Sequence, residues 1–345
     1  MHAAQGHDIS YILPIRIAAS RAEGELADYL RWLSARAEVI VVDGSSAGVF
    51  AAHAVAWGGH VRHVAPAPDL ATPMGKVGGV LTGLRLASHE RVIIADDDVR
   101  YDEAGLQRIA RLLDDASVVR PQNYFTPLPW HALLDSGRML LNRLTGGDWP
   151  GTLAVRRSIL RATGGYDGRA MFENLELVRT VCAAGGTELV ARDLFVARRP
   201  AGTRHFWSQR VRQAYDEFAR PWRLLSQLAV LPALVTLALR WQWRGVAAGA
   251  VAVMLVAEAG RWTGGGRAVF PVAASLLAPC WVAERAICSW LAIGSRILLG
   301  GVPYRGTVLH HAATPMRVLR SRYAGLRRPD HDPLVPDRAP PRRSA

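Results

Sequence analysis

The stretch Val92-Ile93-Ile94-Ala95-Asp96-Asp97-Asp98 decides how the rest of the sequence is interpreted. Four apolar residues, three of them β-branched, predict a buried strand, and three carboxylates follow it without a break. Like charges so close together repel one another unless solvent or a cation neutralises them, and carboxylate oxygens suit Mg²⁺ or Mn²⁺. The stretch therefore predicts a strand that ends at a metal-diphosphate site. The alternative is an acidic loop that caps a helix beginning near Glu103.

The sequence around this strand alternates between strand-like and helix-like runs. The expected strands are Ser10–Ile15, Val39–Val42, His60–Val64, Arg91–Ala95 and Ser117–Arg120. The expected helices lie between them, at 26–37, Val77–Ala87 and Glu103–Asp114. This alternation predicts an α/β fold with a mostly parallel sheet flanked by helices. Ligands bind such sheets beyond the carboxyl ends of the strands, so functional residues are expected there.

Two further motifs are expected at that edge of the sheet. Val41-Val42-Asp43-Gly44 is an apolar strand that ends in an acid and a tight turn, where Asp43 can accept hydrogen bonds from a base or a ribose. Gly75-Lys76-Val77 leads into a helix, a place where backbone amides and an ammonium group can meet phosphate or ribose oxygens. Lys76 is the single lysine among 42 lysine and arginine residues, which favours a specific role for a compact ammonium. A solvated surface lysine is the alternative.

The second half of the chain is apolar and rich in arginine. Four apolar runs occupy 224–239, 246–260, 268–283 and 286–301. Each is shorter than the roughly 20 residues that a membrane helix needs, so the sequence allows two to four crossings, some of them interfacial, or a helical bundle in a soluble protein. The net charge of +13 is concentrated in arginines that flank these runs and crowd the C-terminal end, which favours an anionic membrane surface over nucleic acid.

These observations predict three parts. Residues 1–222 form a cytosolic catalytic domain, because no signal-peptide pattern opens the chain. Residues 223–301 form the membrane helices of a multi-pass protein of the cell membrane. Residues 302–345 form a basic C-terminal tail that is disordered after about 329, and a cytosolic tail requires an even number of crossings. The three cysteines fit reduced structural residues better than a disulfide framework or a zinc cluster.

Together the motifs resemble family 2 glycosyltransferases, which have the GT-A fold, and in particular their membrane-anchored subgroup. The resemblance covers about residues 10 to 310. The residues that carry it are Ile12-Leu13-Pro14, Asp43, Gly75-Lys76, Asp96-Asp97-Asp98, Gly164-Gly165-Tyr166-Asp167, Phe172-Glu173-Asn174-Leu175-Glu176-Leu177, Gln209-Arg210-Val211-Arg212-Gln213 and Val302-Pro303-Tyr304-Arg305-Gly306. Two positions depart from the family pattern. Asn174 stands where the family usually has its catalytic Asp, and Gln213 replaces a Trp, which argues against a processive polysaccharide synthase.

The resemblance implies an inverting, metal-dependent glycosyltransferase that uses a nucleotide-diphospho-sugar donor. Pro14, Asp43, Lys76 and Asp96 would bind the donor, and Asp96 and Asp98 would hold Mg²⁺ or Mn²⁺. Gln209 and Arg212 would steady the diphosphate as the bond breaks. A lipid or lipid-linked acceptor fits an active site held near a membrane.

The catalytic base is open because the amide of Asn174 cannot accept a proton at neutral pH. Glu173 and Glu176 lie three residues apart on one helix face; Glu173 is the first choice as base, and Glu176 is expected to orient the helix. An acceptor that is already an anion, such as a polyprenyl phosphate, would need no base.

Two other classes of protein are considered. A nucleotidyltransferase also binds a nucleotide and a metal through aspartates, but it would be expected to carry a Gly-rich basic loop after the first strand, which Ile15-Arg16-Ile17-Ala18 is not. A noncatalytic membrane scaffold that retains a transferase fold is disfavoured by the intact acid triplet.

Overall fold

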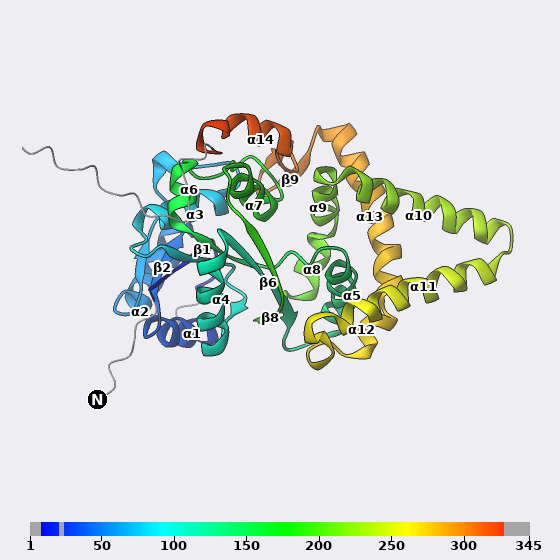
Figure 1. Ribbon diagram of the computed structural model, residues 1–345, viewed down its shortest axis with the longest axis horizontal. Helices are drawn as coiled ribbons and strands as arrows, with labels where there is room; N and C mark the ends of the chain where they lie inside the picture. Colours follow the sequence, from blue (N-terminus) through cyan, green and yellow to red (C-terminus); the bar gives the residue numbers. More distant parts are fainter. Residues whose placement is uncertain (1–7, 21–23, 328–345) are drawn as a thin grey trace, which may run out of the picture.

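An eight-stranded sheet forms the centre of the protein, whose computed structural model describes residues 8–20 and 24–327 (Figure 1). The strands run in the order β3-β2-β1-β4-β7-β6-β8-β5. Their bounds are β1 Ile9–Ile15, β2 Glu38–Asp43, β3 Arg62–Val64, β4 Arg91–Ala95, β5 Val99–Arg100, β6 Val118–Phe125, β7 Thr152–Arg156 and β8 Glu188–Arg198. Four neighbouring pairs are parallel, and the three pairs that involve β7 or β5 are antiparallel.

Helices cover both faces of this sheet because its strands are apolar on both sides. Ile12 and Ile94 pack in one core cluster, whereas the residues that precede them in the strands, Tyr11 and Ile93, pack in another. This alternation is the period of two that a strand imposes on its side chains. The helices of the sheet region are α1 Glu25–Ser34, α2 Ala47–Trp57, α3 Gly75–Leu86, α4 Glu103–Asp115, α5 Trp130–Leu144, α6 Arg157–Ala162 and α7 Glu173–Ala183. The expected α/β fold with a mostly parallel sheet is confirmed, and β6 continues five residues beyond the expected strand.

The C-terminal part is helical and begins beside the sheet. It consists of α8 Thr203–Ser208, α9 Arg210–Tyr215, α10 Pro221–Leu239, α11 Trp243–Trp262, α12 Val272–Leu276 and α13 Ala278–Leu299, with a 3₁₀ turn at Asp216–Ala219 between α9 and α10. Helices α10 and α11 form a hairpin that projects away from the sheet, at the right of Figure 1. Of the described residues, Pro221–Leu239 and Trp243–Ala268 are the two helices long and apolar enough to cross a membrane.

The third and fourth apolar runs do not form separate long apolar helices. They contribute α12 and α13, and α13 contacts α5, α9 and α10. Arg210 of α9 is 1% exposed and pairs with Asp135 of α5 at 2.8 Å and with Glu284 of α13 at 2.5 Å. Buried charges of this kind are tolerated only when they are paired, so these three helices are held in one arrangement.

Residues 302–327 fold back onto the sheet domain. They form the hairpin β9 Val302–Tyr304 and β10 Thr307–Leu309, the helix α14 Met316–Arg322 and a 3₁₀ turn at Ala324–Arg327. Backbone amides of Met171 and Phe172 donate to the carbonyls of His311 and Ala312, both at 2.8 Å. This pairing fixes the segment that leads into α7. The disorder expected after about residue 329 lies outside the described residues.

Candidate active site

The acid triplet lies at the carboxyl end of β4, next to the ends of β7 and β8. The amide of Asp96 donates to the carbonyl of Gly151 at 2.8 Å, just before β7. A Cβ at Gly151 would lie 2.8 Å from Asp96 Oδ2 and 3.0 Å from Arg198 Cζ. A side chain at this position would require the carboxylate and the guanidinium to shift, so the glycine lets both groups approach the backbone before β7.

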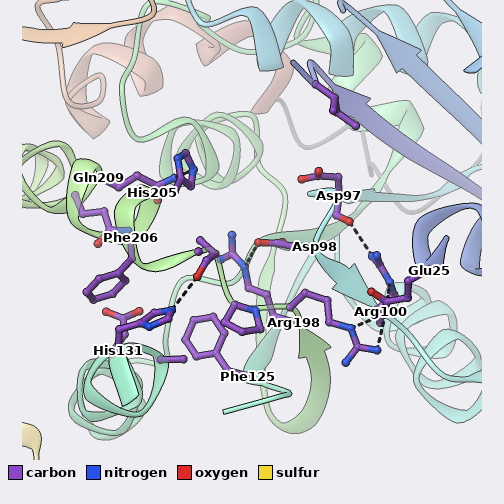
Figure 2. A pocket seen from close by; sticks show the side chains of 18 of the residues that line it. Glu25, Asp97, Asp98, Arg100, Phe125, His131, Arg198, His205, Phe206 and Gln209 are labelled. Carbon is purple, nitrogen blue, oxygen red and sulfur yellow. Dashed lines mark hydrogen bonds and ion pairs between the residues drawn. The ribbon is translucent and has the colours of Figure 1, made fainter. Parts of the chain in front are cut away.

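Two cations neutralise the triplet from either side. Lys76 Nζ, in the first turn of α3, lies 2.5 Å from Asp96 Oδ1 and 2.7 Å from Glu173 Oε1. Arg198, the last residue of β8, lies 3.3 Å from Asp96 through Nη2 and 2.9 Å from Asp98 through Nε. Figure 2 shows the hydrogen bond from Arg198 to the carboxylate of Asp98. The expected site residues Lys76, Asp96, Asp98 and Glu173 are thus brought together.

The charges of this cluster are strongly coupled. Burial would lower the pKa of Lys76, but Asp96 and Glu173 outweigh it and raise the pKa, so the ammonium stays charged. Burial would raise the pKa of Asp96, but Lys76 and Arg198 outweigh it and hold the pKa below its usual value. For Asp98, burial outweighs the opposing charge of Arg198, and its pKa is raised. Of Asp96 and Asp98, Asp98 is therefore the carboxylate whose negative charge is offset less by the neighbouring cations.

The residues present fit a divalent cation. Asp98 Oδ1 is buried and accepts no hydrogen bond from the part of the chain that the structure describes. A buried carboxylate oxygen without a partner is unfavourable, and a hard cation is the kind of ligand that would satisfy it. Asp96 and Asp98 would hold the ion.

A cavity of about 420 Å³ opens beside the triplet, and we call it the strand-end cavity. It is lined from the sheet by Pro14, Val42 and Gly44, which belong to or follow β1 and β2. Lys76 and the three aspartates line it as well. The cavity thus lies beyond the carboxyl ends of parallel strands, where such sheets bind their ligands.

A second cavity, of about 520 Å³, continues from the triplet toward α5 and α8 (Figure 2). Asp97, Asp98 and Arg198 form its border with the strand-end cavity. His205 and Gln209 line both cavities from the α8–α9 segment, and their side chains are hydrogen-bonded to each other. Gln209 thus lines the two cavities that adjoin the acid triplet, and its role there stays a prediction.

A third cavity, of about 220 Å³, lies between the sheet and the C-terminal helices, and we call it the arginine cavity. It shares Asp96 and Arg198 with the strand-end cavity. Glu173 and Asn174 of α7 line it, and Asn174 Nδ2 donates to the carbonyl of Pro150 at 3.0 Å. Asn174 therefore acts as a hydrogen-bond donor to the loop before β7.

Three of the expected site residues lie apart from the carboxylate cluster. Glu176 is fully buried, and its Oε2 accepts a hydrogen bond from the backbone amide of Thr314 at 2.6 Å. Burial raises the pKa of this carboxyl group. Arg212 lies over the ring of Tyr304, with its Cζ 5.7 Å from the ring centroid, and it lines none of the three cavities. Its proposed contact with a diphosphate stays a prediction.

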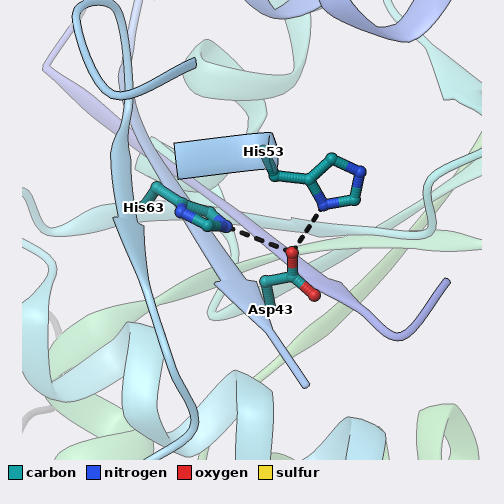
Figure 3. A group of neighbouring side chains, drawn as sticks. All are labelled: Asp43, His53 and His63. Carbon is teal, nitrogen blue, oxygen red and sulfur yellow. Dashed lines mark hydrogen bonds and ion pairs between the residues drawn. The ribbon is translucent and has the colours of Figure 1, made fainter. Parts of the chain in front are cut away.

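Asp43 is the third: it is buried and is not among the residues that line the strand-end cavity. Figure 3 shows its carboxylate facing His53 and His63. Its Oδ2 lies 2.7 Å from His53 Nδ1 and 3.1 Å from His63 Nε2, and its Oδ1 accepts from the amide of Ser45 at 2.9 Å. Burial would raise the pKa of Asp43, but its hydrogen bonds outweigh this and lower it. The carboxylate is thus held in place and ionised, and its contact with a base or ribose stays a prediction.

Arg198 was not predicted from the sequence, because the run that contains it, Phe195-Val196-Ala197-Arg198-Arg199, carries no motif. Its place follows from the antiparallel pairing of Val99 with Arg198, which joins β5 to β8. Arg305 also reaches both larger cavities, from the two-residue turn between β9 and β10, where Arg305 and Gly306 have positive φ angles of 46° and 87°. The aromatic-Arg-Gly segment is a signal that could have placed Arg305 here.

Comparison with known proteins gives similarity to solved structures only. No protein-family model and no curated protein matches the sequence. The chain is similar to the mannosyltransferase PcManGT from Pyrobaculum calidifontis in complex with GDP-Man and Mn²⁺, with 17% identity, a TM-score of 0.48, and coverage of 82% of this chain and 87% of that one.

Two other solved structures show a weaker likeness. For glucosyl-3-phosphoglycerate synthase from Mycobacterium tuberculosis in complex with Mn²⁺, UDP-Glc and phosphoglyceric acid, the identity is 18%, the TM-score 0.38, and the coverage 58% of this chain and 74% of that one. For S. aureus TarS 1-349 in complex with UDP-GlcNAc, the identity is 14%, the TM-score 0.39, and the coverage 58% and 60%. All three bind nucleotide sugars, and none supplies a residue-by-residue correspondence.

Proposed function

We propose that the protein is an inverting glycosyltransferase that moves a sugar from a nucleotide-diphospho-sugar to a membrane-associated lipid acceptor, with the help of Mg²⁺ or Mn²⁺. The observation that carries the proposal is the meeting of two cavities at one charged cluster. The strand-end cavity and the arginine cavity share Asp96 and Arg198, and Lys76 joins Asp96 to Glu173. A donor in one cavity and an acceptor in the other would meet at these residues.

The residues of the cluster have complementary roles in this proposal. The divalent cation, bound by Asp98 and Asp96, would offset negative charge on the departing diphosphate. Arg198 borders all three cavities, so its guanidinium is placed to pair with phosphate oxygens on either side. Lys76 pairs with both Asp96 and Glu173, so it would hold the end of β4 next to the start of α7.

The rival functions make less use of this site. A nucleotidyltransferase would be expected to carry a Gly-rich basic loop after the first strand, whereas Arg16 is the one basic residue that the described part of the β1–α1 connection contributes to the strand-end cavity. A noncatalytic scaffold would have no need of a carboxylate oxygen left without a partner in the middle of a cation cluster. Binding of a nucleoside diphosphate that depends on the metal separates the proposed function from the scaffold.

We expect UDP, GDP or ADP to stabilise the purified protein only when Mn²⁺ is present. A ligand that binds only the native state at 100 times its Kd adds about 2.7 kcal/mol to the free energy of unfolding. The measurement is the melting temperature in detergent with each nucleotide, with and without Mn²⁺, and the matched controls are the corresponding nucleosides. The proposal fails if no nucleoside diphosphate raises the melting temperature, or if chelation of the metal leaves the rise unchanged.

The membrane part of the proposal rests on the α10–α11 hairpin. Helices of 19 and 20 residues are about 30 Å long, which matches the hydrocarbon core of a bilayer. Their apolar residues face outward: Leu225, Leu239 and Leu255 are 55%, 77% and 65% exposed. Two crossings by this hairpin would leave the sheet domain and residues 302–327 on the same side, which we propose is the cytoplasm.

A lysine in the middle of the hairpin is expected to weaken membrane association. Leu255→Lys places a charge in the central part of α11, where insertion of a lysine costs about 3 kcal/mol, and Val235→Lys adds a second charge four residues before the end of α10. The double variant should shift from the membrane pellet to the soluble or aggregated fraction after alkaline extraction. The control is Val55→Lys on α2, which is 88% exposed on the sheet domain and should leave the distribution unchanged. An unchanged distribution of the double variant would argue for a hairpin that lies outside the bilayer.

A further inference from the structure

The arginine cavity is charged in a way that the reaction described so far does not use. It is lined by five arginines and four acidic residues, which are Arg138, Arg198, Arg220, Arg223, Arg285, Asp96, Glu173, Asp216 and Glu217. Most of the arginines are paired with carboxylates: Arg138 with Asp135 and Asp148, and Arg223 with Glu217. Three other groups, Arg285, Arg220 and Asp216, each have a buried polar atom without a hydrogen-bond partner among the described residues.

Arg285 of α13 is a buried cation that forms no ion pair with the described residues, although the charges of Glu284 and Asp135 act on it from a greater distance. The residue is 2% exposed. Its guanidinium donates only to neutral oxygens, which are the carbonyl of Arg210 and Oε1 of Gln213, both at 3.3 Å. Its Nε is buried and has no hydrogen-bond partner in residues 8–20 and 24–327. An unpaired buried charge is strongly unfavourable, so an anion in the cavity that it lines would be stabilised.

Two further groups at the same cavity are unsatisfied. Arg220 donates through Nη2 to Glu217 at 2.8 Å, but its Nε is buried without a partner in the described chain. Asp216 has a buried Oδ1 that finds no partner among the described residues, and burial raises the pKa of its carboxyl well above the usual value. Burial thus favours the neutral form of this carboxyl group, which can donate a hydrogen bond. Two guanidinium N–H groups and an O–H group match the oxygens of a phosphate.

The position of the cavity connects it both to the donor side and to the hairpin. Asp96 and Arg198 separate it from the strand-end cavity, and Glu173 and Asn174 line it. Arg220 is the N-cap of α10, and Arg223 lies in the first turn of this helix, at the foot of the hairpin (Figure 1). A headgroup in this cavity thus lies between the transfer site and the apolar surface that would enter the membrane.

We propose that the acceptor is a lipid phosphate monoester, whose phosphate lies in the arginine cavity against Arg285 and Arg220 and supplies the attacking oxygen. This inference rests on the proposed glycosyl transfer. A phosphate oxygen forms the new bond to the anomeric carbon, and the bond from that carbon to the donor diphosphate breaks. The nucleoside diphosphate leaves with the electron pair, and the product is a glycosyl phosphodiester. No proton has to be removed, which accounts for an asparagine at position 174.

Glu173 then serves as a positioning residue rather than a base. Its Oε1 is held by Lys76 at 2.7 Å, and the start of α7 carries Asn174 toward the cavity. Glu173→Gln keeps an oxygen that can accept from Lys76, so transfer to a lipid phosphate should fall by less than about tenfold. Loss of a true general base costs about 100-fold or more. A loss of that size, with the affinity for nucleoside diphosphate kept, would overturn the phosphate nucleophile in favour of a hydroxyl acceptor.

The binding test uses the full chain in detergent and three probes: a polyisoprenyl monophosphate, the polyisoprenol of the same length, and inorganic phosphate. We expect the lipid phosphate to raise the melting temperature, and the alcohol and inorganic phosphate to do so only at far higher concentration. Arg285→Met and Arg220→Gln should each weaken lipid phosphate binding by about 10- to 100-fold, the loss typical of a charge-assisted hydrogen bond. Arg285→Met removes an unpaired buried charge, so the fold should persist.

The controls separate this inference from the proposed function. Arg161→Gln removes an exposed arginine from α6 and should leave lipid phosphate binding unchanged. The affinity for nucleoside diphosphate with Mn²⁺ should stay within about twofold of the unmodified protein in all three variants, because the expected loss concerns binding of the acceptor and not of the donor. Equal binding of the alcohol, equal binding of inorganic phosphate, or unchanged binding in both cavity variants overturns the inference. Absence of nucleotide binding in the unmodified protein would instead overturn the proposed function.

Discussion

Asp98→Ala is expected to lower the rate of glycosyl transfer by about 100- to 1,000-fold, the usual cost of removing a group that stabilises charge in a transition state. Of the two proposed metal ligands, Asp98 is the one with a buried oxygen, Oδ1, that has no partner among the described residues, so it is the more available to a cation. The fold should persist, because the side chain is partly exposed, at 26%, and lies at a strand end. The metal-dependent rise in melting temperature with nucleoside diphosphate should be lost together with transfer.

Two comparisons make this prediction specific. Asp97→Ala should have a smaller effect, because Asp97 borders the cavities but is not one of the two proposed metal ligands. Asp115→Ala removes an exposed acid at the end of α4 and should leave transfer within about twofold, as is usual for surface changes. Wild-type turnover by Asp98→Ala at saturating Mn²⁺ would show that the metal assignment is wrong.

Lys76→Met is expected to lower transfer by about 100-fold, since charge-stabilising groups in active sites contribute effects of this size. Its ammonium joins Asp96 to Glu173, and without it two carboxylates face each other across the point where the cavities meet. Lys76→Arg should not restore full activity, because the planar guanidinium is larger and presents its donors in a fixed fork. The measurement is kcat and KM for transfer, together with the melting temperature.

The matched control for Lys76 lies on the same helix. Arg85 of α3 is exposed, at 51%, and pairs with Asp69 at 2.7 Å. Because exposed ion pairs contribute little to stability, Arg85→Met should change neither transfer nor the melting temperature appreciably. Full activity of Lys76→Met would mean that Lys76 is the solvated surface lysine of the alternative interpretation.

Local patterns in the sequence located the elements that carry the site. The runs around Ile12, Ile40 and Ile93 are short and β-branched, and each forms a strand within two residues of the expected bounds. The acids and the glycine-lysine turn follow these strands directly, so their common edge could be predicted from chain order alone. The same holds for α10 and α11, because a continuous apolar run needs no distant partner to be recognised.

The partners in ion pairs cannot be predicted from such local patterns. Of the two arginines in Gln209–Gln213, the resemblance favoured Arg212, whereas the structure buries Arg210 between Asp135 and Glu284, residues about 75 positions away on either side. The two histidines that hold Asp43 are likewise placed by α2 and β3. In a chain with so many arginines, the sequence offers each carboxylate many possible partners, and packing selects among them.

The α/β sheet, the acid triplet at the end of a strand, the single lysine near it and the apolar runs of the C-terminal half can be predicted from the sequence, because all of these depend on residues that are neighbours along the chain. Three features appear only in the folded chain: Arg198 closes the acid cluster, residues 302–327 return to the sheet, and Arg220 and Arg285 line one cavity with an Nε that has no partner among the described residues. Those features depend on strand pairing and helix packing between segments some 60 to 140 residues apart, and the burial that leaves a charge unpaired exists only once those segments have come together.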